Sequence, residues 1–313
     1  MLDVKRLKVL REVARSGSFS AAADELGYTQ PAVSQQISAL EREAGTRLLQ
    51  RGARGVTLTD AGRALVDHSD AILARLAAAE EELEAIAGLR GGRLRLASFP
   101  TAGATLVPLA IAMFSERHPQ VELTLTEAEP EDALPMLRSG DLDVALTFEY
   151  SSLPGSAYSS LHEELDLIPL LDDPMYVALP PDHPFANTRN LRLEQLADES
   201  WSQADCEGLC GKMHLAACEA AGFEPQVGFR SDDYNVVQGL VAAGVAISLI
   251  PELALSNLRD DIVIRSLGKR APVRRVAAAT LPADVRSPAT DGMLEILVEA
   301  AREYEAQRRD LAA

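Results

Sequence analysis

The sequence of 313 residues is poor in cysteine and in long apolar runs, and each shortage excludes a class of protein. Three cysteines are too few for the disulfide framework of a small secreted domain. No apolar run reaches the roughly 20 residues that a transmembrane helix needs. Residues 1–18 are charged throughout and lack the apolar centre of a signal peptide. We therefore expect a cytoplasmic protein with no membrane partner.

The sequence also lacks the motifs by which common enzymes are recognised. It has no GxGxxG loop, no Walker lysine loop, no Ser-His-Asp spacing and no carboxylate pair tied to a motif. The five histidines are scattered, and His118 and His183 each precede a proline, as turn residues do. We expect no enzyme, no cofactor and no metal. An enzyme and an exported solute-binding protein are the competing classes, and the second would need an export signal.

What is present is an uneven charge. The chain is too long for one typical core, and its formal net charge is −17. Residues 1–65 nevertheless carry ten Lys or Arg against seven Asp or Glu, whereas the remainder carries 20 against 40. A basic head on an acidic body indicates a polyanionic partner for the head.

Residues 1–58 are predicted to form a small domain of three helices and a hairpin. Gly17 ends the first helix, and Ser20 is expected to cap a second over residues 21–26. Gly27 follows at a position where the backbone must turn with positive φ. Two helices joined by such a tight turn are typical of a helix-turn-helix.

The third predicted helix has one buried and one polar face. Thr29 caps it, and Val33, Ile37 and Leu40 recur at i, i+4 and i+7 on the buried side. Glutamine and serine can hydrogen-bond base edges in the major groove, whereas a merely solvated face usually carries Glu and Lys. The outer face, which we expect to contact DNA with Thr29, comprises Gln30, Pro31, Ser34, Gln35 and Ser38.

A predicted hairpin follows over residues 48–59. Its tip lies at residues 52–55, and Arg51 and Arg54 lie at or beside that tip. Guanidinium groups there suit contact with phosphates or the minor groove. The hairpin is therefore interpreted as the wing of a winged helix-turn-helix.

The segment FSAAADELGYTQPAVSQQISALEREAGTRLLQRGARGVTLTDAG, residues 19–62, resembles the DNA-binding segment of LysR-type transcriptional regulators. One departure is Leu49, where the family usually has phenylalanine. The resemblance implies a sequence-specific regulator that binds a partly palindromic promoter site in double-stranded DNA. It also implies a homotetramer assembled from dimers, with RNA polymerase as a candidate partner.

Residues 59–87 are predicted to form one long linker helix of about 40 Å. An apolar seam recurs along it, which favours a coiled-coil homodimer over an intramolecular partner. The seam comprises Leu65, Ser69, Ile72, Leu76, Ala79, Leu83 and Ile86.

Residues 91–308 alternate strands and helices, which predicts parallel βαβ units in two lobes. The segments LDVALTF, LPPDHPFA and DDYNVVQGLVAAGVAISLIPELAL resemble the effector domain of LysR-type regulators, which is similar to periplasmic binding proteins. The resemblance implies lobe I over residues 91–162 and 268–308, lobe II over 163–267, and a small-molecule effector between them. The expected fold class is α+β overall: a winged helix-turn-helix, a linker helix and a two-lobed α/β effector domain.

Effector contacts are expected where strands end, close to helix N-termini. For each such residue the alternative is a helix cap, or a core position for the only tryptophan. The candidates are Ser98, Phe99, Pro100, Thr101, Thr147, Phe148, Trp201 and Ser202.

Four metal- or thiol-type residues are spaced by four along one segment: Cys206, Cys210, His214 and Cys218. They could hold a metal or sense oxidation from one helix face. Gly208 and Gly211 interrupt the segment, and cysteine among alanines behaves as a small apolar residue. We favour packing and keep thiol or metal sensing as the alternative.

Overall fold

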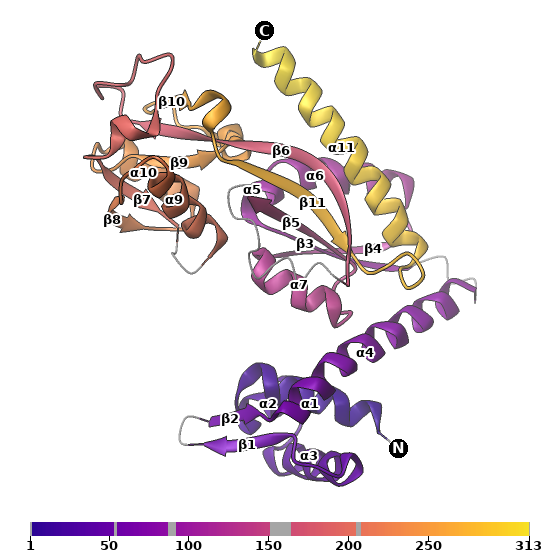
Figure 1. The fold of residues 1–313 in the computed structure, drawn as a ribbon. Coiled ribbons are helices and arrows are strands. Elements are labelled where there is room, and N and C mark those ends of the chain that lie inside the picture. The colour runs from indigo at the N-terminus through magenta and orange to yellow at the C-terminus, as the bar shows by residue number, and fades with distance from the viewer. Residues whose placement is uncertain (1, 53–54, 87–91, 151–163, 205–207, 313) are drawn as a thin grey trace.

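The computed structural model describes residues 2–52, 55–86, 92–150, 164–204 and 208–312. It shows a small N-terminal unit joined by one long helix to a larger body (Figure 1). The N-terminal unit consists of α1 (Val4–Ser16), α2 (Phe19–Leu26), α3 (Gln30–Ala44), β1 (Leu49–Gly52) and β2 (Gly55–Leu58). Its core is made of side chains that are fully buried, including Leu7, Leu10, Val13, Val33 and Leu40.

The turns of this unit follow from local chemistry. Gly17, Gly27 and Gly45 end the three helices with φ of 63°, 65° and 70°, which glycine adopts without steric cost. The predicted cap of α2 was wrong by two residues. Ser18, not Ser20, is the cap, because the Ser18 hydroxyl accepts from the backbone N–H groups of Ser20 and Ala21, so the helix begins at Phe19.

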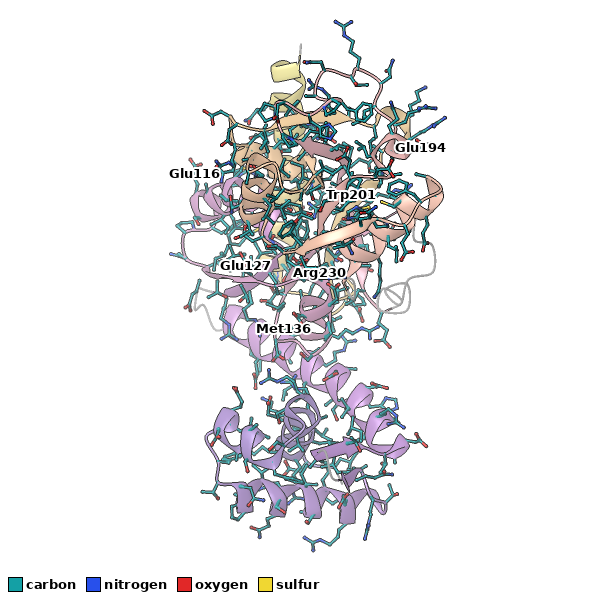
Figure 2. All side chains as sticks on the ribbon, turned by 90° about the vertical axis from the view of Figure 1, so that its left-hand side faces the viewer. Glu116, Glu127, Met136, Glu194, Trp201 and Arg230 are labelled. Carbon is teal, nitrogen blue, oxygen red and sulfur yellow. The ribbon has the colours of Figure 1, made fainter. Side chains whose placement is uncertain are left out.

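Helix α4 (Asp60–Ile86) leaves the N-terminal unit and passes beneath the body. It packs on α1 at one end and contacts α7 of the body (Pro130–Arg138) further along. Figure 2 shows Met136 of α7 at the end of the body that faces α4. Ile72, Leu76 and Leu83 of the predicted seam are exposed, whereas Ser69 is buried within the chain. Ile72, Leu76 and Leu83 therefore leave an apolar strip of α4 open to solvent within one chain.

Within the described residues the body is built on a sheet of seven strands. The order is β10-β6-β11-β5-β3-β4, with β9 also paired to β6. The bounds are β3 Arg93–Ser98, β4 Glu122–Glu127, β5 Val144–Tyr150, β6 Asp166–Leu179, β9 Ser248–Pro251, β10 Val263–Ser266 and β11 Val273–Thr280. Strand β3 pairs in parallel with β4 and β5, as the βαβ pattern predicts.

Strands β6 and β11 depart from that pattern, because they are antiparallel to each other (Figure 1). Strand β6 reaches both lobes: residues 166–174 pair with β11, and residues 175–179 pair with β9 and β10 of lobe II. The segment MYVALP predicts a strand over residues 175–180, whereas the observed strand begins at Asp166 and includes Pro169 and Pro174. The structure tolerates Pro169 next to an irregularity, where the register to β11 shifts between Val276 and Ala277. The two lobes are thus joined by one continuous strand, β6.

Helices and short strands complete the lobes. Lobe I carries α5 (Pro100–Gly103), α6 (Leu106–Arg117), α7 and the C-terminal α11 (Pro288–Ala312). Lobe II carries α9 (Leu209–Ala220), α10 (Tyr234–Ala242) and the parallel pair β7 (Ser200–Gln203) and β8 (Gln226–Arg230). Three short 3₁₀ helices lie at Leu193–Leu196, Glu252–Asn257 and Gly268–Arg270. None of the helices in the described ranges has the length and apolarity to cross a membrane.

Candidate functional site

The outer face of α3 is solvent-accessible along its length. Gln30, Pro31, Gln35 and Ser38 are exposed, and Ser34 is half-buried. The Thr29 hydroxyl accepts from the N–H of Ala32 at 3.4 Å and caps the helix. These side chains therefore form one short polar surface, with the buried face of the helix behind it.

Two adjacent glutamines of α3 have different surroundings. The side chain of Gln36 accepts from Nε of Arg6 on α1 at 3.2 Å, and so faces the interior of the unit. Gln35, one position earlier, is exposed. Gln36 therefore contributes to packing within the unit, whereas the neighbouring Gln35 is available at the surface.

The β1–β2 hairpin is fixed to α3 through Glu41. One carboxylate oxygen of Glu41 accepts from the N–H groups of Leu48 and Leu49, at 2.8 and 3.3 Å. Leu49 is buried, so leucine packs where the family usually has phenylalanine. Arg51 pairs with Val56 in the hairpin, but its side chain, like the whole of Arg54, lies outside what the structure describes.

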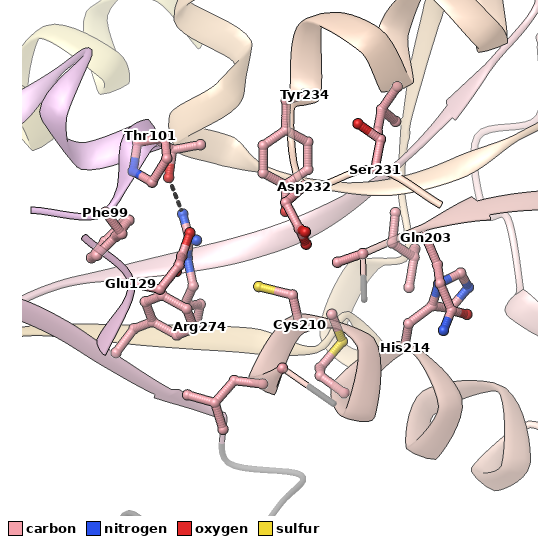
Figure 3. A pocket seen from close by; sticks show the side chains of 18 of the residues that line it. Phe99, Thr101, Glu129, Gln203, Cys210, His214, Ser231, Asp232, Tyr234 and Arg274 are labelled. Atoms are coloured by element: carbon pink, nitrogen blue, oxygen red, sulfur yellow. Dashed lines mark hydrogen bonds between the residues drawn. The ribbon is translucent and has the colours of Figure 1, made fainter. Parts of the chain in front are cut away.

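A second candidate site lies between the two lobes. A cavity of about 410 Å³ is lined by residues of both lobes and of strands β6 and β11. Figure 3 shows Phe99, Thr101, Glu129 and Arg274 at one end, with Gln203 and His214 at the other. A concave site of this size suits a small molecule.

Arg274 on β11 and Asp173 on β6 form a fully buried ion pair at this cavity. They are direct cross-strand neighbours, and Oδ2 of Asp173 accepts from Nε and Nη2 of Arg274 at 2.8 and 2.6 Å. Oδ1 of Asp173 accepts from the N–H of Leu253 at 3.0 Å, and Nη2 of Arg274 also donates to the hydroxyl of Thr101 at 2.6 Å. Burial lowers the pKa of Arg274, but the Asp173 carboxylate together with Tyr150, Tyr234 and Cys210 outweighs burial, so that pKa is raised.

Two aromatic rings enclose the guanidinium group. The Arg274 carbon Cζ lies 4.7 Å from the ring centres of both Phe99 and Phe148. These rings meet edge to face, with centres 4.9 Å apart. The cation is therefore neutralised by Asp173 and shielded by the rings.

The predicted effector residues fall into two groups. Phe99, Pro100, Thr101 and Phe148 line the cavity. The other four are buried without lining it: Ser98, Thr147, Trp201 and Ser202. Trp201 lies in the interior of lobe II, with its ring centre 4.8 Å from that of His214 (Figure 2).

Carboxylates surround the cavity. Glu129, Glu131 and Asp132 come from the start of α7, and Asp232 precedes α10. Burial, together with the nearby Glu131 carboxylate, raises the pKa of Glu129 to about 7 against the pull of Arg274. Glu131 accepts from the N–H of Leu209 at 3.2 Å, so a lobe I carboxylate caps a lobe II helix.

The cysteine segment is divided by the structure. Cys210 lines the cavity, and its sulfur lies 3.4 Å from the Tyr150 hydroxyl, whereas Cys218 is buried in the core. Burial raises the pKa of both thiols and lowers that of His214 to about 4. Cys206 lies outside the described residues, and among those described no group of three or more His, Cys, Asp or Glu could hold a metal.

Sequence reasoning missed Arg274, Asp173 and Glu129. A signal was present in the strand RRVAAATL, because Arg274 shares the i, i+2 face of Val276 and Ala278, which are buried. A charged residue on a buried strand face requires a partner. The sequence alone does not identify this partner, because the pairing of β11 with β6 decides which residue lies opposite Arg274.

The winged head, the linker helix and the two-lobed body together define a DNA-binding regulator, and comparison of the sequence with known families gives the same result. Residues 4–63 match the bacterial regulatory helix-turn-helix protein, lysR family, and residues 87–302 match the LysR substrate binding domain. The chain belongs to the LysR family of transcriptional regulators.

Particular relatives respond to peroxide according to their names. The chain is 31% identical over 306 residues to the hydrogen peroxide-inducible genes activator of Dickeya chrysanthemi, covering 97% of this chain and 96% of that protein. The fold is similar to full-length OxyR of Pseudomonas aeruginosa, with TM-score 0.67 and 24% identity over 96% of this chain and 95% of that one. A hydrogen peroxide-bound OxyR mutant of Corynebacterium glutamicum has TM-score 0.60 and 26% identity, covering 100% and 98% of the two chains. Such relatives are regulators rather than enzymes.

Proposed function

We propose that α3 reads a partly palindromic promoter site in the major groove. Gln30, Pro31, Ser34, Gln35 and Ser38 contact base edges, and Thr29 fixes the start of the helix. Wing residues Arg51 and Arg54 contact the backbone or minor groove. The open strip on α4 pairs two chains, and two such pairs form a tetramer that acts in the cytoplasm and alters the access of RNA polymerase.

Gln35 and Gln36 offer a matched test of this assignment. Gln35→Ala should change the selected bases and weaken specific binding by about five- to a hundredfold, the usual value of a good base contact. Gln36→Ala should leave base preference unaltered, because that side chain contacts Arg6. In vitro selection from random duplexes, followed by footprinting, measures both. Equal base preferences for Gln35→Ala and the wild type would contradict the assignment.

We further propose that a small-molecule effector binds between the lobes and controls transcription. The observation that carries this proposal is the cavity of about 410 Å³, lined from both lobes around the enclosed Arg274. Ligand that contacts both lobes favours one relative arrangement of them. The head is connected to lobe I, because Arg11 of α1 donates to the Ser139 carbonyl and to Asp141, at 3.2 and 3.3 Å, so a movement of lobe I can reach the head.

Filling the cavity tests this control. Ala204 is a small, half-buried cavity residue, and Ala204→Phe should lock the response of a reporter gene in one state. Ala306→Phe on the exposed side of α11 is the control for an added aromatic ring. An unchanged, fully inducible response with Ala204→Phe would argue against an effector in this cavity.

Thiol sensing at Cys210 is the second candidate, favoured by its place in the cavity and by the peroxide-responsive relatives. A thiolate there would attack one oxygen of hydrogen peroxide and break the O–O bond, which gives sulfenic acid and a hydroxide that takes up a proton to become water. Burial raises the pKa of Cys210 and so limits the reactive thiolate. Cys218 lies two turns along α9, about 12 Å by helical rise, so a disulfide requires that helix to unwind.

The two modes are separable by substitution. If Cys210 is the sensor, Cys210→Ser should abolish sulfenic acid formation and the change of footprint on peroxide addition, while Cys218→Ser should retain the former. If the effector binds without covalent chemistry, Cys210→Ser should remain inducible. Mass spectrometry of peroxide-treated protein and footprinting of the same samples provide the two readouts.

A further inference from the structure

More acidic than basic side chains line the inter-lobe cavity. Of the described residues that line it, Glu129, Glu131, Asp132 and Asp232 are acidic, and Arg274 is the one that carries a positive charge, because burial lowers the pKa of His214 to about 4. Arg274 is not available to balance them, because it is paired with Asp173, which lies behind the cavity wall. The rings of Phe99 and Phe148 also cover the guanidinium group.

Helix dipoles reduce this excess without removing it. Helices α7, α9 and α10 begin at the cavity, and each N-terminus is equivalent to about half a positive charge. Together they offset between one and two carboxylates. Two of them are already capped, α9 by Glu131 and α10 by Asp233. An anionic ligand would therefore find no free helix end on α9 or α10 and would be repelled by the carboxylates of Glu131 and Asp132.

A buried amide adds an independent indication. Gln203 lines the cavity and is 6% exposed, and its Oε1 has no hydrogen-bond partner among the described residues. An unsatisfied buried carbonyl oxygen requires an N–H or O–H donor. Figure 3 places Gln203 at the end of the cavity away from Arg274, with Asp232 and Cys210 on either side of the space between.

We infer that the effector is a cation: an organic amine or guanidine whose charged nitrogen lies among Glu129, Glu131 and Asp232, with a further donor to Gln203. This inference rests on the proposed effector site and names the chemical class of its ligand. The ionisation of the Glu129 carboxyl group on ligand binding provides a readout of this inference. A cation nearby favours the ionised carboxylate, so binding near neutral pH should expel the proton that the raised pKa retains.

The test is calorimetric titration of the full chain with three sets of probes matched in length. Putrescine and agmatine are the cations, 1,4-butanediol is the neutral analogue, and succinate is the anion. The cations should bind at least tenfold more tightly than the diol, and succinate should not bind. Titration of the cations in buffers of different ionisation enthalpy should show proton release at pH 7.

Glu129→Gln should weaken cation binding by about ten- to a hundredfold, the range of a hydrogen bond to a charged group, and should abolish the proton release. Glu122→Gln, an exposed acid of β4 outside the cavity, is the matched control and should change neither. Absence of binding by either cation, or an affinity unaffected by Glu129→Gln, overturns the inference. Succinate binding that Ala204→Phe removes overturns the inference but supports the effector site. An inducible Ala204→Phe protein contradicts the effector site itself.

Discussion

Removal of the Arg274 guanidinium should destabilise the body severely, and the loss should depend on Asp173. Arg274→Met leaves the Asp173 carboxylate fully buried with, among the described residues, the Leu253 N–H as its remaining donor. An unpaired buried charge costs about 3–5 kcal/mol. Loss of the cation from two ring faces adds about 1–2 kcal/mol. Because a domain is stable by only about 5–15 kcal/mol, this is a large fraction.

The double variant isolates the ionic part. Arg274→Met with Asp173→Asn removes both charges and should recover at least about 2 kcal/mol of the loss in either single variant. Urea unfolding followed by tryptophan fluorescence is the assay, because Trp201 is the only tryptophan and lies buried in the body. A loss below about 1 kcal/mol in Arg274→Met, or single losses that simply add in the double variant, would refute the reasoning.

Three further predictions concern other parts of the chain. Gly62→Ala should destabilise the head by about 1–3 kcal/mol in calorimetry, because its Cβ would lie 2.1 Å from the Leu48 carbonyl oxygen; Gly239→Ala, with nothing within 4 Å, should not, and equal effects would contradict the packing. Glu129 faces Glu131, Arg274, Asp232 and Glu127, and its pKa of about 7 means that its stabilising contribution is complete below about pH 4.5 and lost as pH rises through 7. The free energy of unfolding of Glu129→Gln should therefore be higher than that of the wild type at pH 8 by on the order of 1–2 kcal/mol, allowing for solvent screening, and should equal it near pH 4.5 in urea titrations. A difference in unfolding free energy that does not change with pH would contradict this prediction. Arg11→Ala should weaken coupling between effector and DNA while sparing DNA affinity without effector, because Arg11 contacts the body; undiminished induction in a reporter assay would reject this.

The fold was largely predictable because its signals are local. Glycines at helix ends, the i, i+4, i+7 positions of Val33, Ile37 and Leu40, and the alternation in β3 each depend on a few neighbouring residues. Strand β6 was only half predicted, since Pro169 and Pro174 oppose a strand locally and pairing with β11 overrides them.

The site was less predictable because it depends on pairing between distant segments. Phe99, Thr101 and Phe148 could be proposed from strand ends alone. Arg274 and Asp173 are 101 positions apart and meet only because β11 and β6 lie side by side. The raised pKa of Glu129 likewise arises from burial and Glu131, which single-residue patterns do not reveal.

The continuity of β6 between the lobes has a mechanical consequence. Two lobes joined only by a flexible linker can move freely, whereas β6 is hydrogen-bonded to β11 in lobe I and to β9 and β10 in lobe II, so this strand must bend or twist if the lobes approach each other. The register irregularity at Val276 and Ala277 is the place where the pairing of β6 with β11 yields most easily, and the Arg274–Asp173 pair lies next to it. We therefore expect the lobes to move by small relative rotations, and a signal to the DNA-binding head to be transmitted as a twist of the body rather than as a wide opening and closing of the lobes.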